Sequence, residues 1–323
     1  MRAMRLLAAA TAVFAYLLVA LSPIVRITGS GMGCGDHWPL CNGKLFPPLD
    51  NLAVMIEWGH RLAVVGLTVL VVAFLAAAWV VRRAPGVAGP GGVLRPVLLA
   101  AVLLVIQSLL GAVTVWLELP PGVVVVHMLN AMALLAAVLV AAFRAFRGPA
   151  TTRPRASPTT WRGALAAVTL GAAALLLGAL TANLHAGTAC QGFPLCNGRW
   201  WPSGDGGGLA HLHWMHRLVA YGLALHLLTM SVTVWRRAEP VRVRVAAWLA
   251  AGVLGVHVSV AAALVLEFLP LALRVTHAAL GALVWVTLLS LAWVASPDRL
   301  GGRQVPDSGT GADREDRVRR SSR

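Results

Sequence analysis

Eight apolar segments, each long enough to cross a lipid bilayer, constrain this chain more than any other feature of its sequence. They cover residues 6–26, 54–81, 96–117, 122–143, 162–183, 209–235, 245–266 and 271–295. A transmembrane helix needs about 20 mostly apolar residues. Only 12% of the residues are charged, against roughly 25% in soluble domains. The sequence therefore predicts an all-α integral membrane protein with eight transmembrane helices. We interpret the first segment as a retained helix, to which a cleaved signal peptide is the alternative.

Basic residues are unevenly distributed between the two sides of these predicted helices. Twenty-one of the 27 Lys and Arg residues lie at the N-terminus, in alternate connections and in the C-terminal tail. Such an excess marks the cytoplasmic side, so we expect a multi-pass membrane protein with both termini in the cytoplasm. The net charge of +15 is then explained by topology and by contact with anionic membrane lipid, and we expect no nucleic-acid partner.

An internal repeat divides the chain into two related halves. In each half a loop with two cysteines is followed by a helix that begins with Trp-x-His-Arg, and the first cysteine precedes this histidine by 26 residues. These histidines are His60 and His216. A second histidine follows in each half, 20 residues after Gln107 in the first half and 20 residues after His257 in the second. Agreement at so many positions indicates duplication of a four-helix unit.

The repeat also predicts the domain organisation. We expect an N-terminal four-helix bundle over residues 1–147 and a C-terminal four-helix bundle over residues 162–295. A cytoplasmic linker over residues 148–161 joins them, because this stretch is rich in Arg, Pro and Thr. Residues 296–323 are rich in Arg, Asp, Gly and Ser, and this composition predicts a disordered cytoplasmic tail.

Four histidines recur at equivalent positions: His60 and His127 in the first half, and His216 and His277 in the second. All four lie near the outer ends of their predicted helices. Histidines on facing helices of a four-helix bundle can supply both axial ligands of a haem iron. An isolated interfacial histidine that bonds to a loop is the alternative for any one of them. A tetrahedral zinc site would need ligands at shorter spacing. We therefore expect two haem sites.

The four cysteines form two close pairs in the predicted outer loops, Cys34 with Cys41 and Cys190 with Cys196. An oxidising extracytoplasmic face favours disulfides, and pairing within each loop is the economical arrangement, although sequence leaves other pairings open. Bridges that shape the loops are one interpretation, and a redox role is the other.

Glu57 lies three residues before His60, on nearly the same helix face, and its counterpart in the second half is His213. A partly buried carboxylate can transfer protons or stabilise positive charge, so we expect Glu57 to be catalytic; pairing with Arg61 is the alternative. Arg61 and Arg217 are candidates for binding haem propionates. The alternative is that each arginine extends its charge to the membrane interface. The spacing of the remaining polar residues assigns no role to Gln107, His257, His211 or His213.

These residues together resemble the haem A synthase family, in its bacterial eight-helix type with two outer-loop cysteine pairs. The resemblance rests on both cysteine pairs, on Glu57-x-x-His60-Arg61, on the helix start at His127 and on the repeated pair His216 and His277. It covers residues 1–295. The family is described as oxidising a ring methyl of haem O to the formyl group of haem A, by successive hydroxylations, for terminal cytochrome oxidase.

The resemblance implies roles for the repeated residues. His60 and His127 would hold the substrate haem, His216 and His277 would hold a permanent haem b that passes electrons, and Glu57 would assist the oxidation. It also implies a bacterial cell membrane location, haem O synthase and cytochrome oxidase assembly as partners, and a membrane electron donor such as a quinol. Two other functions remain open from the residues: a quinol-linked dihaem electron-transfer cytochrome, and a haem or solute transporter.

Overall fold

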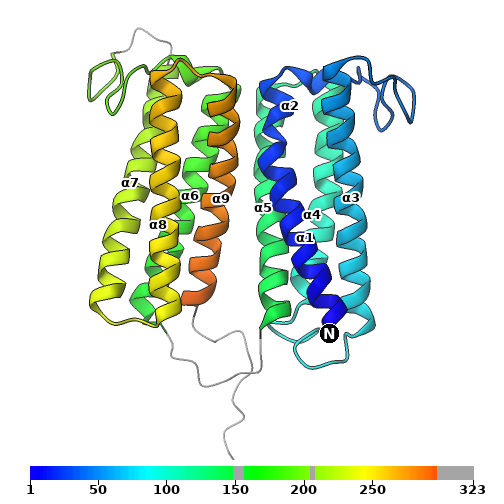
Figure 1. The fold of residues 1–323 in the computed structure, drawn as a ribbon, viewed down its shortest axis with the longest axis vertical. Helices are drawn as coiled ribbons and strands as arrows, with labels where there is room; N and C mark the ends of the chain where they lie inside the picture. Colours follow the sequence, from blue (N-terminus) through cyan, green and yellow to red (C-terminus); the bar gives the residue numbers. More distant parts are fainter. Residues whose placement is uncertain (148–155, 204–207, 297–323) are drawn as a thin grey trace, which may run out of the picture.

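The computed structural model describes residues 1–147, 156–203 and 208–296, and in them the chain is helical (Figure 1). The helices are α1 Arg2–Leu21, α2 Pro23–Ile27, α3 Leu52–Val80, α4 Leu94–Trp116, α5 Pro121–Phe146, α6 Pro158–Asn183, α7 Leu209–Arg236, α8 Val241–Leu266 and α9 Leu271–Ala295, with short 3-10 helices η1 Ser30–Met32 and η2 Ala186–Thr188. Eight spans in this described part are long and apolar enough to cross a membrane, α1 and α2 forming the first of them. The predicted class, an all-α membrane protein with eight spans, is confirmed.

The outer connections between α4 and α5, and between α8 and α9, reverse the chain direction with the same backbone conformation. After Trp116 the residues Glu118 and Leu119 take positive φ angles, and Pro120 then sets an extended backbone before α5. After Leu266 the residues Phe268 and Leu269 repeat this, and Pro270 precedes α9. A residue in the left-handed region ends a helix, and a proline at its start fixes φ without losing a needed hydrogen bond.

The eight spans form two four-helix groups that stand side by side (Figure 1). In the first, α1 packs against α3 and α5, and α4 also packs against α3 and α5. In the second, α6 and α8 each pack against α7 and α9. Each group is thus a closed ring, in which α3 stands diagonally opposite α5, and α7 opposite α9. Much of the predicted linker (148–155) and nearly all of the predicted tail (297–323) lie outside the described residues.

The two groups meet along α1 and α5 on one side and α6 and α9 on the other. Trp285 of α9 packs into the apolar core of the first group and donates a hydrogen bond from its indole nitrogen to the Met132 carbonyl oxygen at 3.1 Å. Phe143 of α5 stacks on Trp293 of α9, with ring centroids 5.5 Å apart. These contacts fix the position of one half against the other.

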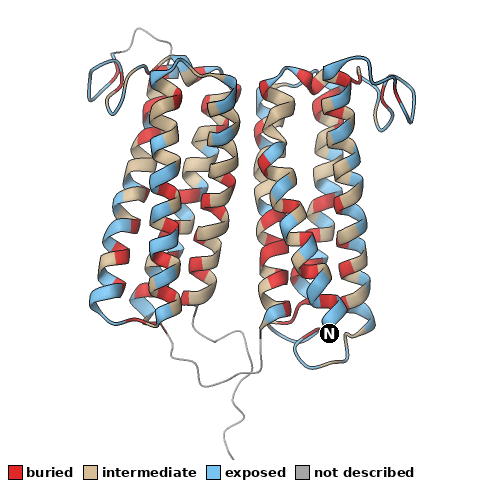
Figure 2. Cartoon of the chain, viewed as in Figure 1, coloured by how far each residue is buried: buried red, intermediate tan, exposed pale blue. Residues whose placement is uncertain are grey.

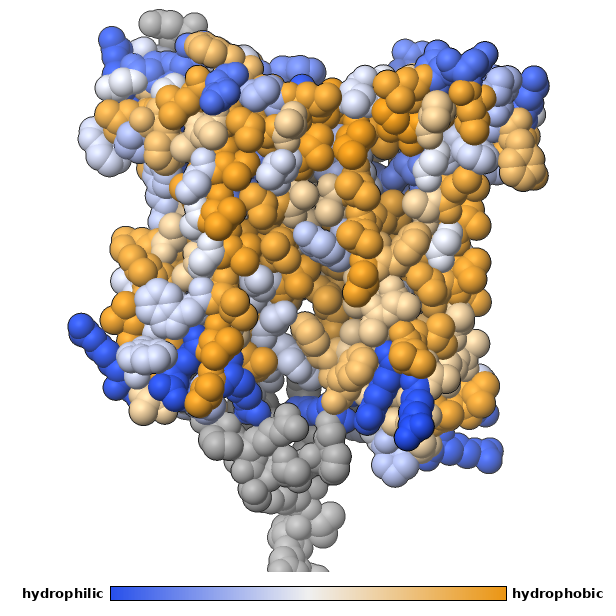
Figure 3. Space-filling view, viewed as in Figure 1, coloured by the Kyte–Doolittle hydropathy of each residue, from blue (hydrophilic) through white to orange (hydrophobic). Residues whose placement is uncertain are grey.

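Buried side chains lie inside the two groups, and the outward faces of the helices carry many exposed Leu, Val and Trp side chains (Figure 2). Figure 3 shows this apolar surface on one face of the molecule, with hydrophilic side chains gathered at both ends. The disulfide loops lie at the end opposite the N-terminus (Figure 1). Such an apolar surface, on eight helices long enough to cross a bilayer, makes the chain a multi-pass membrane protein.

A buried carboxylate ties α6 to the connection between α7 and α8. Glu239 accepts hydrogen bonds from the Thr160 hydroxyl at 2.7 Å and from the Ser157 backbone N–H at 3.2 Å. Burial raises the pKa of Glu239, but these hydrogen bonds outweigh it and hold the pKa below its usual value. The first turn of α6, which has backbone N–H groups without helical partners, is thereby stabilised.

Candidate functional site

The four repeated histidines lie within the first three turns of helices that begin at the loop-bearing end: α3, α5, α7 and α9. His60 and His127 are therefore on diagonally opposite helices of the first ring, and His216 and His277 are on diagonally opposite helices of the second. Diagonal helices face one another across the centre of a bundle, which is where bundles hold cofactors. The fold brings together both pairs that the repeat singled out.

In the first ring, neighbouring side chains set the orientation of both imidazoles. The Ser22 hydroxyl donates to the Leu18 carbonyl oxygen and lies 3.4 Å from His60 Nδ1, which leaves Nε2 of His60 with its lone pair. Nε2 of His127 accepts a hydrogen bond from the Gln107 amide at 2.9 Å. That amide is held in turn, because its oxygen accepts from Asn130 at 2.7 Å. Gln107 therefore contacts the nitrogen through which His127 would bind iron.

In the second ring, His216 packs against the backbone of α6. Its Nδ1 donates to the Ala174 carbonyl oxygen at 3.1 Å, so Nε2 again carries the lone pair. A Cβ atom at Gly178 would lie 2.9 Å from Cε1 of His216, closer than real Cβ atoms approach, so the ring position requires glycine there. His277 stacks on His257, with ring centroids 4.3 Å apart and planes 14° from parallel.

These environments fit a flat cofactor held by two imidazoles. Three buried imidazole nitrogens, Nδ1 of His127, His257 and His277, have no hydrogen-bond partner, which is costly in a buried site. Among the described residues, no three His, Cys, Asp or Glu side chains gather as a metal cluster. Two imidazoles on opposite helices of a bundle suit the axial positions of a haem iron.

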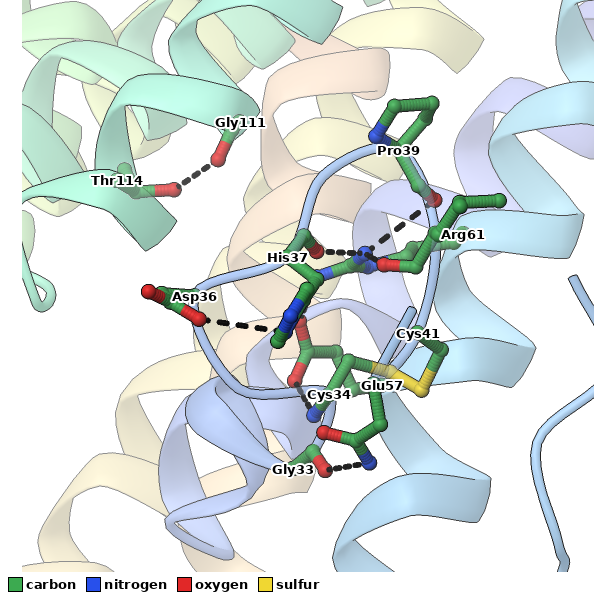
Figure 4. Close-up of polar contacts among 12 residues, drawn as sticks. Gly33, Cys34, Asp36, His37, Pro39, Cys41, Glu57, Arg61, Gly111 and Thr114 are labelled. Atoms are coloured by element: carbon green, nitrogen blue, oxygen red, sulfur yellow. Dashed lines mark hydrogen bonds and ion pairs between the residues drawn. A yellow bond between two sulfur atoms is a disulfide. The ribbon is translucent and has the colours of Figure 1, made fainter. Parts of the chain in front are cut away.

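Glu57 and Arg61 lie on α3 directly beneath the first disulfide loop (Figure 4). The Glu57 side chain is buried, and its carboxylate accepts from Arg61 at 2.5 Å and from the Cys34 backbone N–H at 2.8 Å. Arg61 also donates to the carbonyl oxygens of His37 at 2.8 Å and Leu40 at 2.6 Å. The ion pair that the sequence offered as the alternative for Glu57 is thus present, and the catalytic role stays a prediction.

His213 and Arg217 make the corresponding link in the second half. His213 Nδ1 donates to the Ala186 carbonyl oxygen at 3.1 Å, and its Nε2 accepts from Arg217 Nε at 3.3 Å. Arg217 donates further to the carbonyl oxygens of Gly192 and Cys190, at 2.8 and 2.5 Å. Both halves therefore use the same two positions to hold the loop to the helix. They differ in charge, since only the first half has a carboxylate there.

The disulfide loops are paired as expected, Cys34 with Cys41 and Cys190 with Cys196, and all four cysteines are buried. The two arginines predicted to bind propionates, Arg61 and Arg217, each donate hydrogen bonds to carbonyl oxygens of these loops. The propionate role of both residues stays a prediction. His211 contacts the Trp201 ring at 5.7 Å between centroids, away from the histidine pairs.

Several contact residues were not found by sequence reasoning. Ser22 and Gly178 are 156 residues apart, the same offset that relates His60 to His216, and each lies against its own histidine. A comparison of all positions of the two repeats, not only of those with histidine, cysteine or charge, would have paired Ser22 with Gly178. Asn130 and Ala174 carry no such signal, because Asn130 has no polar counterpart and Ala174 acts through its backbone.

The fold and these contacts define a class: an eight-span helical membrane protein with a pair of diagonal histidines in each half. The sequence matches the family of cytochrome oxidase assembly proteins, COX15-CtaA, over residues 5–54 and 51–289, and the chain belongs to this family. It is 30% identical over 249 residues to heme A synthase of Alkalihalophilus pseudofirmus, covering 74% of this chain and 78% of the relative. It is 30% identical to heme A synthase of Symbiobacterium thermophilum, covering 92% and 97%.

The heme A synthase of Shewanella oneidensis is 27% identical over 87% of this chain and 93% of its own length. Similarity thus extends over both halves. The family membership expected from the resemblance is confirmed.

Proposed function

We propose that this protein is a haem A synthase, a membrane oxidoreductase that converts the ring methyl of haem O to the formyl group of haem A. The observation that carries the proposal is the presence of two diagonal histidine pairs in a chain whose relatives bear that name. A haem held by two histidines would need facing imidazoles and an apolar pocket, and a bundle core inside a membrane can supply both.

The two halves take different roles in this proposal. His60 and His127 hold the substrate haem, and His216 and His277 hold haem b, which when bound supplies one-electron redox chemistry. The asymmetry at Glu57 and His213 supports this division. Glu57 is the carboxylate beside His60 on α3, and a buried carboxylate can accept a proton as the methyl group is oxidised. His213, which is held by Ala186 and Arg217, has no such charge to offer.

The residues around the histidines have positioning roles. Ser22 and Ala174 fix the tautomers of His60 and His216, so that Nε2 of each faces away from its anchor. Gln107 holds His127 by its Nε2, the nitrogen that would bind the haem iron. Arg61 and Arg217 keep the disulfide loops over the outer ends of the two sites, which restricts the access of water.

Location and partners follow from the same proposal. The gathering of arginines at the end that bears the N-terminus supports a cell membrane orientation with both termini cytoplasmic and the disulfides outside. Haem O synthase supplies the substrate, the assembly of cytochrome oxidase consumes the product, and a membrane reductant such as a quinol supplies electrons.

The test is to co-express the chain with a source of haem O and to identify the haems that co-purify with it. We expect haem b together with haem O and haem A, separated by chromatography and identified by mass. Recovery of haem b alone, with haem O present in the cells, would instead favour an electron-transferring dihaem cytochrome. Recovery of no haem would favour a transporter.

A glycine at the haem b site gives a sharper local prediction. Gly178→Ala places a methyl group 2.9 Å from Cε1 of His216 and must displace that ring. We expect the C-terminal half to retain markedly less haem b, while the helix itself gains slightly because alanine is the better helix former. The measurement is the haem-to-protein ratio after purification. Gly252→Ala on α8, which meets no atom within 4 Å, is the matched control and should keep the wild-type ratio.

A further inference from the structure

Two arginines at the interface between the halves have no carboxylate partner, although they are half-buried. They are Arg26 of α2 and Arg274 of α9, and α2 packs directly against α9. Within residues 1–147, 156–203 and 208–296, the carboxylates that form ion pairs are Asp36 and Glu57, and neither bonds to these arginines. A buried cation is costly unless it is paired, so an unpaired couple at one place points to an anion.

The side-chain contacts of the two arginines are few. Arg26 donates one hydrogen bond, to the Ala182 carbonyl oxygen of α6 at 3.3 Å, and Arg274 is the partner in no side-chain hydrogen bond of the described residues. Arg217, by contrast, donates to three carbonyl oxygens and to His213. A guanidinium has five N–H donors, so Arg26 and Arg274 keep most of theirs for a ligand.

Their positions relate both arginines to one histidine pair. Ala182, which Arg26 contacts, lies one helical turn beyond Gly178, and Gly178 lies against His216. Arg274 lies three residues before His277, on the same face of α9 and nearer the loop-bearing end. The two cations therefore flank the outer side of the site between His216 and His277. They also lie close enough for their charges to repel each other, which an anion between them would relieve.

We propose that Arg26 and Arg274 bind the propionate carboxylates of the haem held by His216 and His277. This inference rests on the proposed function. Arginine pairs with carboxylate through two parallel hydrogen bonds, which gives orientation as well as affinity. Arg26 belongs to the first half and the haem to the second, so the cofactor site is completed by a residue from the other bundle (Figure 1). Bound haem b thereby holds the two halves together at their outer ends.

The experiment compares haem b with its dimethyl ester, which lacks the carboxylates. Full-length protein from haem-starved cells is purified in detergent and titrated with each compound in the ferric state, following the Soret band. A His127→Ala background restricts the titration to the C-terminal half. We expect haem b to bind at least about tenfold more tightly than the ester, and the Arg26→Gln, Arg274→Gln double variant to lose this preference.

Control variants separate this site from a general charge effect and from a failure to fold. Arg199→Gln removes an exposed arginine from the outer loop and should leave the preference unchanged. Arg274→Lys keeps the charge but not the paired geometry, and should retain part of the preference. Circular dichroism shows whether each variant keeps its helices.

Three results would overturn the inference. A double variant that still prefers haem b over its ester as strongly as the parent would show that the propionates bind elsewhere. If that variant instead loses a tightly bound anionic phospholipid, seen by native mass spectrometry, with an unchanged preference, the anion is a lipid headgroup. Failure of the His127→Ala parent to bind either compound would overturn the proposed haem function and this site together.

Discussion

His216→Ala is expected to abolish the haem b spectrum of the C-terminal half while haem binding in the N-terminal half persists. His216 is held by the Ala174 carbonyl oxygen with Nε2 free, on a helix diagonally opposite His277. Loss of one of two axial ligands leaves iron with a single imidazole in an apolar pocket. The measurement is the reduced-minus-oxidised spectrum of purified protein, together with the haem content of each sample.

The matched control lies on the same helix. His226→Ala removes a histidine whose Nε2 donates to the Gly163 carbonyl oxygen at 2.9 Å. His226 lies ten residues beyond His216, toward the end of α7 that is away from the disulfide loops. The His226→Ala variant should keep the wild-type spectrum. A second variant, His216→Gly, tests whether loss is specific, because added imidazole can occupy the vacated space and restore the spectrum. An unchanged spectrum in His216→Ala would remove this residue from the ligand pair.

Glu57→Gln is expected to lower the formation of haem A by about 100-fold, the loss typical of removing one general acid or base. Glutamine keeps the shape of the side chain and an oxygen that can accept from the Cys34 backbone N–H. It cannot carry the negative charge or take up a proton. The variant therefore removes the chemistry of Glu57 and preserves most of its contact with the disulfide loop. The ratio of haem A to haem O in co-expressing cells reports the effect.

The structure supplies the control for this experiment. His213 holds the equivalent position in the second half and links Arg217 to the Ala186 carbonyl oxygen. His213→Gln should weaken that loop but leave haem A formation within a few-fold of wild type. If Glu57→Gln also forms haem A at the wild-type rate while Glu57→Ala does not, then Glu57 serves to position the loop and Arg61, and another group transfers protons.

Sequence reasoning predicted the helices to within a few residues. Differences of three or four residues occur at inner helix ends; for example, α5 continues to Phe146 and α8 begins at Val241, beyond the predicted 143 and 245. Basic side chains such as Arg144 and Arg242 were counted as loop residues there, because hydropathy drops at a charge even when the helix continues. Long side chains can extend their charges toward the membrane surface from within a helix.

The candidate site was predicted unevenly. The repeat singled out His60, His127, His216 and His277, because duplicated chemistry leaves a signal at a fixed offset. The repeat also made Arg61 and Arg217 candidates for propionate ligands. In the structure both arginines donate hydrogen bonds to loop carbonyl oxygens. Arg26 and Arg274 have no repeat-related partner of the same type, so nothing in the sequence set them apart from other arginines near helix ends.

The sequence by itself determined the eight spans, the duplication and the histidines that the duplication preserves. Each span must satisfy its own backbone hydrogen bonds within the lipid. It therefore forms a helix of apolar residues that can be recognised from its own segment of sequence. The tertiary structure alone decided which helices face each other diagonally, what holds each imidazole, and that Arg26 of one half reaches the α6 backbone of the other. Such contacts join residues up to 156 positions apart and depend on how helices pack, which no local pattern records.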